Sequence, residues 1–271
     1  MAFAPPADFD VRDQVLDGNE SFIRDALRVD LDGWARFRYA INIGNSAECL
    51  HARKPIKESV QEAYRELAKS HYEVVTSLGS ARLSLNALFE LPWVHPLIAK
   101  KSVKELYFSF GCVLDNLARL VYIVNDPRSA NEKYTSGWRK GLLRRHWIGW
   151  GELSRCNYRG YVAYARRVQL RQVINIRNHL THQWGCPIIH DRQGMPYWPL
   201  AARTQRVFLW PFDEEDEMRQ RYRKWIPVTS MTKSDFEFVE RLQNDVFRRL
   251  TKDIRRFERN YGLVIGEPKL V

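Results

Sequence analysis

The sequence predicts a mainly helical fold, an antiparallel helical bundle with a small β-hairpin insertion before a long last helix. Long stretches repeat apolar residues at every third or fourth position, which is typical of amphipathic helices. One window, 186–232, instead combines turn residues with short aromatic and β-branched runs. The apolar fraction of 45% in 271 residues is sufficient for a sizeable core. We therefore expect a single domain over residues 1–271.

The N-terminal segment, residues 1–52, is predicted to wrap the core with short helical pieces. Asp-Gly pairs at 17–18 and 32–33 are turn signals. Residues 1–10 carry acids and a Pro-Pro pair, where a secretory signal would have a basic and then an apolar stretch. We therefore expect a soluble, cytoplasmic protein.

Residues 53–185 are predicted to form the helical core. Its first helix is predicted to have Pro55 in the first turn, where proline is favourable. The apolar stripe of this helix continues to Gly79. A second apolar stretch, 83–91, ends at a proline. His71 lies on the stripe of the first helix, and a lone histidine in such a place is more often a packed core residue than a ligand.

The next predicted helix, 101–126, has a wide apolar face that Asp115 and Asn116 interrupt. One interpretation is a buried polar pair that hydrogen-bonds a neighbouring helix and fixes its packing. The other is that Asp115 faces the helix of Arg177 and orients a functional side chain there. Charged and amide side chains within 106–124 argue against a membrane span.

The window 139–177 is strongly basic, with ten Lys or Arg and one acid, in a chain of net charge +11. Such a window can follow a phosphate backbone, so we interpret its arginine cluster as facing RNA. The alternative is a solvated face. The interleaved aromatic residues are expected in the core. The predicted RNA-binding residues are Arg144, Arg145, Arg166, Arg167 and Arg171.

A predicted helix over 159–183 carries Arg177, Asn178 and His182 near its end. Arginine presents a fork of donors that matches phosphate oxygens, and histidine transfers protons near neutral pH. Arg177 and His182 lie about 140° apart around a helix, whereas Asn178 and His182 share a face. Either the Arg177 side chain reaches around its own helix toward the face of His182, or a second helix supplies the rest of the pocket. The helix dipole favours protonated His182 and so predicts a raised pKa for it.

This pattern, Arg177 and Asn178 followed by three residues and then His182, resembles the motif of the HEPN superfamily of all-helical domains. The resemblance implies a metal-independent endoribonuclease without a cofactor, in which two motif copies form one composite site across a symmetric homodimer. It also implies a toxin or antiviral-defence effector that an antitoxin restrains or infection activates. Asp115, as an acid on an adjacent helix, and His179, within the motif, are the supporting candidates.

The insertion, 186–232, is predicted to contain a β-hairpin with its turn at 191–194 and strands on either side. Further strand candidates are 206–210 and 225–229. The last helix, 233–263, is predicted to begin at a capping box formed by Ser234 and Glu237.

Two alternatives to a nuclease remain open. His179, His182, Cys186 and His190 are four potential zinc ligands, although their spacing matches no standard zinc motif. The other alternative is a non-catalytic RNA-binding or scaffold protein, in which Arg177 and His182 only pack or contact phosphate. The four cysteines are widely spaced and are predicted to be reduced thiols.

Overall fold

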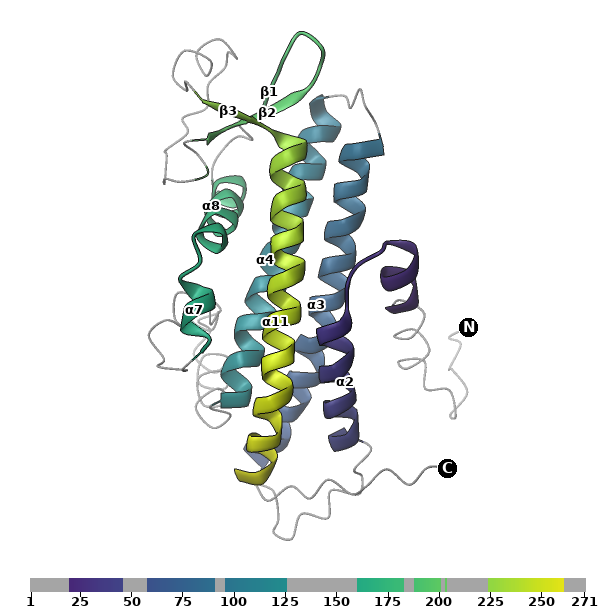
Figure 1. Cartoon of the computed structure of the whole chain (residues 1–271), viewed down its shortest axis with the longest axis vertical. Coiled ribbons are helices and arrows are strands. Elements are labelled where there is room, and N and C mark those ends of the chain that lie inside the picture. Colours follow the sequence, from purple (N-terminus) through teal and green to yellow (C-terminus); the bar gives the residue numbers. More distant parts are fainter. Residues whose placement is uncertain are drawn as a thin grey trace, which may run out of the picture.

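In the computed structural model, the structure describes residues 20–45, 58–90, 96–125, 160–182, 188–200, 203 and 224–260. Three long helices form the centre: α3 (Glu58–Glu90), α4 (Pro96–Asn125) and α11 (Val228–Asn260). They lie side by side, with α3 antiparallel to the other two (Figure 1). Helices make up 81% of the interpretable residues. The prediction of a mainly α protein with a small sheet is therefore confirmed.

Within the N-terminal segment, residues 20–45 are described; they contain a short π-helix η1 (Phe22–Ala26) and the helix α2 (Asp32–Asn45), which packs against α11 and α3. The predicted turn at 32–33 is wrong, because these residues begin α2. A Cβ on Gly33 would lie 2.5 Å from the backbone oxygen of Asn244 on α11. Glycine is thus required here for the close approach of two helices rather than for a turn. The turn predicted at 17–18 lies outside the described residues.

Helix α3 continues through Gly79, so the prediction of two separate helices is wrong. A Cβ on Gly79 would lie 2.8 Å from two side-chain carbons of Ile23 on η1. Gly79 therefore provides space for η1 without ending the helix. A single glycine costs a helix only about 1 kcal/mol, and the packing of a 33-residue helix overrides that cost.

Helix α4 is the apolar centre of the bundle. It begins at Pro96, five residues before the predicted start, because proline is well suited to a first helical turn. Its segment Leu97–Asn125 is long and apolar enough to cross a membrane, but 67% of the most apolar window is buried inside the protein. Asn116 donates to the backbone oxygen of Cys112 on its own helix. The interpretation that Asn116 bonds a neighbouring helix is therefore wrong.

The predicted motif helix is divided into α7 (Val162–Ala165) and α8 (Val168–His182). The backbone turns at Arg167, whose N–H donates to the carbonyl of Tyr164 at 3.1 Å. At this turn the Arg167 guanidinium lies 4.9 Å from the Tyr164 ring centroid and 3.6 Å from Asp245 on α11, and the i to i−3 hydrogen bond replaces the α-helical pattern. The prediction of one continuous helix over 159–183 is wrong for this reason.

The insertion contains the predicted hairpin, formed by β1 (Ile189–His190) and β2 (Pro196–Pro199), which pair in antiparallel fashion. Asp191 closes the turn by accepting hydrogen bonds from two backbone N–H groups, and Gly194 has a φ of 80°. A third strand, β3 (Trp225–Pro227), pairs with β2. The strand candidate 225–229 is thus confirmed for its first three residues, and 206–210 lies outside the described residues.

Helix α11 begins at Val228, directly after β3, so the predicted capping box is wrong. Ser234 and Glu237 lie in the second and third turns instead. Within the first turns, the hydroxyl of Thr232 donates to the backbone oxygen of Val228 at 2.8 Å. The predicted long amphipathic helix itself is confirmed, and its buried stripe packs against α2, α3 and α4.

Candidate active site around Arg177

Arg177 on α8 is held against α4. Its Nη2 donates to Oδ2 of Asp115 at 3.1 Å. The Arg177 side chain is 29% exposed and the Asp115 side chain 16% exposed, so the pair stands at the edge of the core with part of the guanidinium open to solvent. The structure thus brings together two residues that lie 62 positions apart in the sequence. Asp115 faces the motif helix and accepts a hydrogen bond from it, which fits both interpretations of this residue, a packing contact between helices and an orienting carboxylate.

Gly111, one helical turn before Asp115, creates the space that Arg177 occupies. A Cβ at this position would lie 2.7 Å from Nε, 3.2 Å from Cζ and 3.3 Å from Cδ of Arg177. The guanidinium end of Arg177 therefore crosses α4 over the bare backbone of Gly111. The Nε atom is buried and has no hydrogen-bond partner among the described residues. The sequence analysis did not identify Gly111, and a glycine four positions before a carboxylate is only a weak signal.

Burial dominates the electrostatics of this site. It raises the pKa of Asp115, and the nearby positive charge of Arg177 opposes this effect without cancelling it. Burial and the Asp115 carboxylate also raise the pKa of the neighbouring Cys112 thiol. Cys112 therefore stays protonated near neutral pH and is not a thiolate nucleophile. The charged side chains in contact at this site are therefore Asp115 and Arg177.

The other motif residues occupy different surroundings. Asn178 is half-buried, and His179 is buried at 4% exposure, so His179 is a core residue that is closed to a substrate. Helix α8 extends to His182, whose side chain lies outside what the structure describes. By helical periodicity, position 182 shares a face with Arg171 and Asn178, about 140° from position 177. Arg177 and position 182 therefore do not share a face of α8.

The predicted RNA-binding arginines differ in exposure. Arg166 and Arg171 are exposed, and Arg167 is 41% exposed while it pairs with Asp245. Arg144 and Arg145 lie outside the described residues. Among the aromatic residues of this window, Tyr161 is buried and its hydroxyl donates to Asp253 at 2.6 Å, as expected for a core residue.

For the zinc alternative, the described residues contain no group of three or more His, Cys, Asp or Glu side chains that could hold a metal ion. Cys186 lies outside the described residues, as does the His182 side chain. His71, predicted as a core residue, stacks on Trp34 with the ring centroids 4.7 Å apart, and burial lowers its pKa to about 3. That prediction is confirmed.

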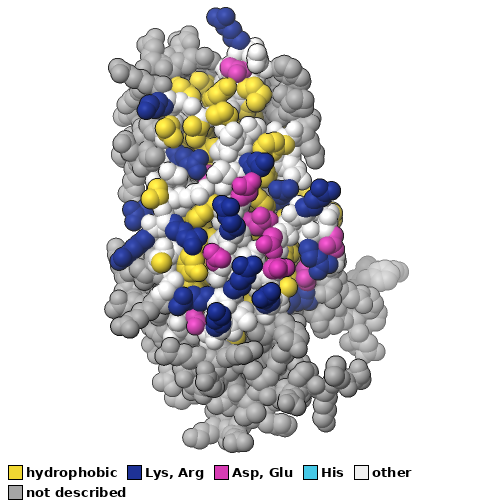
Figure 2. Space-filling view, viewed as in Figure 1, with side chains coloured by type: hydrophobic (Ala, Val, Ile, Leu, Met, Phe, Trp, Pro, Cys, Tyr) yellow, Lys and Arg dark blue, Asp and Glu magenta, His cyan; other side chains and the backbone are white. Residues whose placement is uncertain are grey.

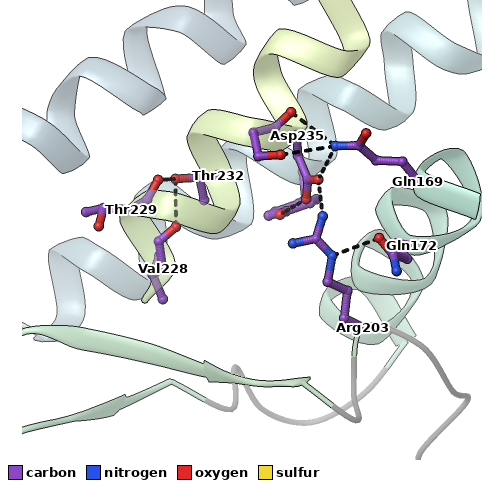
Figure 3. Close-up of polar contacts among 9 residues, drawn as sticks. Gln169, Gln172, Arg203, Val228, Thr229, Thr232 and Asp235 are labelled. Carbon is purple, nitrogen blue, oxygen red and sulfur yellow. Dashed lines mark hydrogen bonds and ion pairs between the residues drawn. The ribbon is translucent and has the colours of Figure 1, made fainter. Parts of the chain in front are cut away.

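A second polar cluster, centred on Asp235, joins α4, α8 and α11 (Figure 3). The fully buried Asp235 accepts from the hydroxyl of Tyr107 at 2.6 Å, from Gln169 at 3.2 Å and from Arg203. Arg203 also donates to Gln172 at 3.1 Å. The sequence analysis missed this cluster because it placed Asp235 in a helix cap. The signal was its position four residues before Val239, within the buried stripe of α11.

Comparison of the chain with protein-family models, with curated proteins and with solved structures finds no match. The functional argument therefore depends on the local chemistry of the site. The site consists of an arginine that donates to a half-buried carboxylate at the edge of a group of packed helices, with a histidine at the end of the same helix.

Proposed function

We propose that the chain is a metal-independent endoribonuclease of the HEPN type that acts as a toxin or antiviral-defence effector. The observation that carries the proposal is the contact of Arg177 with Asp115 across α8 and α4, with the guanidinium partly open to solvent. The carboxylate engages one edge of the planar guanidinium and thereby fixes its orientation. The remaining N–H groups of the guanidinium can then donate hydrogen bonds to phosphate oxygens in a defined direction.

The chemistry follows from the residue types. A neutral His182 imidazole takes the proton of a ribose 2′-hydroxyl as that oxygen bonds to the adjacent phosphorus. The bond from phosphorus to the 5′-oxygen breaks, and a protonated imidazole supplies the proton that this oxygen needs. The products are a 2′,3′-cyclic phosphate and a 5′-hydroxyl, so no water or metal enters the step. Arg177 stabilises the charge that accumulates on the non-bridging oxygens.

A symmetric homodimer completes this proposal. Two imidazoles, one from each protomer, would provide the base and the acid for the same phosphate. The position of Arg177 on the α4 face, about 140° around α8 from position 182, favours a composite site, because one helix does not direct both residues at one point. An antitoxin or activating partner would act on this assembly.

The decisive experiment is cleavage of mixed-sequence single-stranded RNA in excess EDTA, with the fragment ends analysed. The unmodified chain should release cyclic-phosphate ends and leave DNA intact, because DNA lacks the 2′-hydroxyl. Arg177→Ala and His182→Ala should each lose at least about 10²-fold in rate. Arg192→Ala, which removes an exposed arginine from the hairpin turn, is the matched control and should cleave normally.

A specific observation also favours a second candidate, a non-catalytic RNA-binding protein. The ion pair of Arg177 with Asp115 would equally serve as a bridge between α8 and α4. In that case RNA would bind in a salt-dependent manner without turnover, and Arg177→Ala would lower the free energy of unfolding. Cyclic-phosphate products from the unmodified chain alone would decide in favour of the nuclease.

A further inference from the structure

The surface that joins α8 to the lower half of α11 carries a concentration of exposed cations. On α11, Arg241, Arg248 and Lys252 are exposed and recur at helical spacing, so they form one stripe. Asp245 lies in the same stripe and is 3.6 Å from Arg167, the residue directly before α8. This contact places the α11 stripe beside Arg167. In the space-filling view, many basic side chains lie on this face of the molecule, interspersed with acidic ones (Figure 2).

We propose that this surface, which we call the α8–α11 basic surface, binds the phosphate backbone of the RNA substrate independently of its sequence. The inference rests on the proposed function and deepens it, because it names where the substrate is held. The surface is made of Arg166, Arg167, Arg171, Arg241, Arg248 and Lys252.

The stripe on α11 carries three exposed cations and two acids, Asp245 and the exposed Glu237 one turn before Arg241, and the three arginines around the start of α8 keep the surface positive. Asp245 is shared by Arg167 at 3.6 Å and Arg248 at 3.9 Å, so one carboxylate faces two guanidinium groups. Asp253 accepts the hydroxyl hydrogen bond of Tyr161 at 2.6 Å. Higher on α11, Glu240 accepts a hydrogen bond from the backbone N–H of Asp30 and thus faces the N-terminal segment. The positive charge is therefore greatest next to α8.

The chemistry of the surface favours a nucleic-acid backbone over a protein partner. Of the seven large apolar side chains that are exposed among the described residues, six lie on η1, α3 or α4, and Val168 alone lies on α8. Stable protein interfaces have an apolar core, and among its described residues this surface offers only Val168 for one. Aromatic stacking platforms would read bases, whereas exposed Arg and Lys bind phosphate without reading sequence.

The surface also leads toward the proposed site. Arg171 lies on α8 at the same helical face as Asn178 and position 182, because these positions are seven and eleven residues apart. Position 182 is about 16 Å from position 171 along the helix axis. A strand that is bound at Arg241 and Arg248 can therefore continue past Arg171 to the end of α8, where cleavage is proposed.

The test compares two triple variants that change the net charge equally. Arg241→Gln with Arg248→Gln and Lys252→Gln neutralises the α11 stripe, and Lys100→Gln with Lys101→Gln and Lys104→Gln is the control on α4. Both are made in the His182→Ala background, so that cleavage does not disturb binding. The affinity for a labelled single-stranded RNA is measured by fluorescence anisotropy at several salt concentrations, after circular dichroism has confirmed that each variant is folded.

The α11 triple variant should bind RNA about 100-fold more weakly at 0.1 M salt, since each lost phosphate contact removes about 0.7 from the salt slope. The control should change less than about 3-fold. Equal weakening by both triples, or no RNA binding by the starting protein, would overturn the proposal. The proposal would also be overturned if polyglutamate bound as tightly as RNA and lost affinity to the same extent in the α11 triple variant. That result would assign the surface to an acidic polypeptide.

The two proposals fail in different ways. If the unmodified chain does not cleave RNA but the α11 triple variant loses RNA binding, the proposal of the basic surface stands and the proposal of a nuclease fails. If the unmodified chain cleaves RNA and the α11 triple variant keeps its affinity for RNA, the proposal of a nuclease stands and the proposal of the basic surface fails.

Discussion

Gly111→Ala tests whether the position of Arg177 across α4 matters for function. The new Cβ would lie 2.7 Å from Nε and 3.2 Å from Cζ of Arg177, whereas non-bonded carbon atoms pack at about 3.5–4.0 Å. The guanidinium must therefore move by about 1 Å. Its 3.1 Å contact with Asp115 would lengthen or break as a result.

The two effects of this substitution have different sizes. Alanine favours a helix over glycine by about 1 kcal/mol, and the partly exposed arginine can move away from the methyl group, so overpacking costs little. We expect the free energy of unfolding to change by less than about 1 kcal/mol. A displacement of about 1 Å at a positioned catalytic group can cost about 10²-fold in rate, so RNA cleavage should fall by that amount.

The assay is kcat/KM for RNA in EDTA together with urea unfolding, and Gly79→Ala is the matched control. A Cβ on Gly79 would lie 2.8 Å from the side chain of the buried Ile23, which has no room to move into solvent. That variant should lose about 1–3 kcal/mol of stability and keep its activity while folded. Normal cleavage by Gly111→Ala, alongside an inactive Arg177→Ala, would refute the reasoning.

Three further predictions concern the buried polar groups. Asp115→Asn should lower kcat about 10²-fold with little change in KM, since Asp115 orients Arg177 without contacting RNA; a larger effect on KM would contradict this. Asp235→Asn should lower the free energy of unfolding by about 3 kcal/mol in urea, because it weakens a buried ion pair with Arg203 and a hydrogen bond with Tyr107; a loss below 1 kcal/mol would show that these contacts contribute little. His71, whose pKa falls to about 3 through burial, binds its proton in the unfolded chain below pH 6.5 but not in the folded one. Stability should therefore decrease by up to about 1.4 kcal/mol per pH unit as the pH falls from 6.5 toward 3, and His71→Phe should remove this part of the slope in urea unfolding at pH 5 and 7.

The helices that the sequence predicted well are those whose stability comes from one continuous apolar stripe. Helix α11 is the clearest case, because its stripe repeats over 33 residues. Local signals were misleading where tertiary contacts outweigh them. Gly33 and Gly79 look like breaks in the sequence, but each allows another segment to approach closely. The division at Arg167 could not be predicted, because residues 161–183 contain no proline or glycine to mark a break.

The candidate site was predictable in its chemistry and only partly in its geometry. The motif identified Arg177, and the interruption of an apolar face identified Asp115. Their contact depends on how α4 packs against α8, which no local pattern specifies. Gly111 was missed because a glycine gives no chemical signal of its own. Asp235 was missed because its sequence neighbours suggested a helix cap, although its position follows the buried stripe.

The pair of Arg177 and Asp115 contributes little to the free energy of unfolding. Burial raises the pKa of Asp115 in spite of the adjacent guanidinium, so the attraction does not compensate for the desolvation of the carboxylate. Gly111 beneath it costs the helix about 1 kcal/mol relative to alanine. Locally unfavourable choices that meet at one side chain are typical of functional sites.

Replacing an ion pair that has lost part of its hydration by apolar residues is often neutral or stabilising, and the pair of Arg177 and Asp115 is half-buried. Arg177→Met combined with Asp115→Leu should unfold in urea with the same free energy as the unmodified chain, or up to about 2 kcal/mol more, while cleavage is abolished. A loss of 3 kcal/mol or more in the double variant would mean that the pair holds α8 against α4. In that case the motif would be structural, and the non-catalytic RNA-binding protein would be the better explanation of the chain.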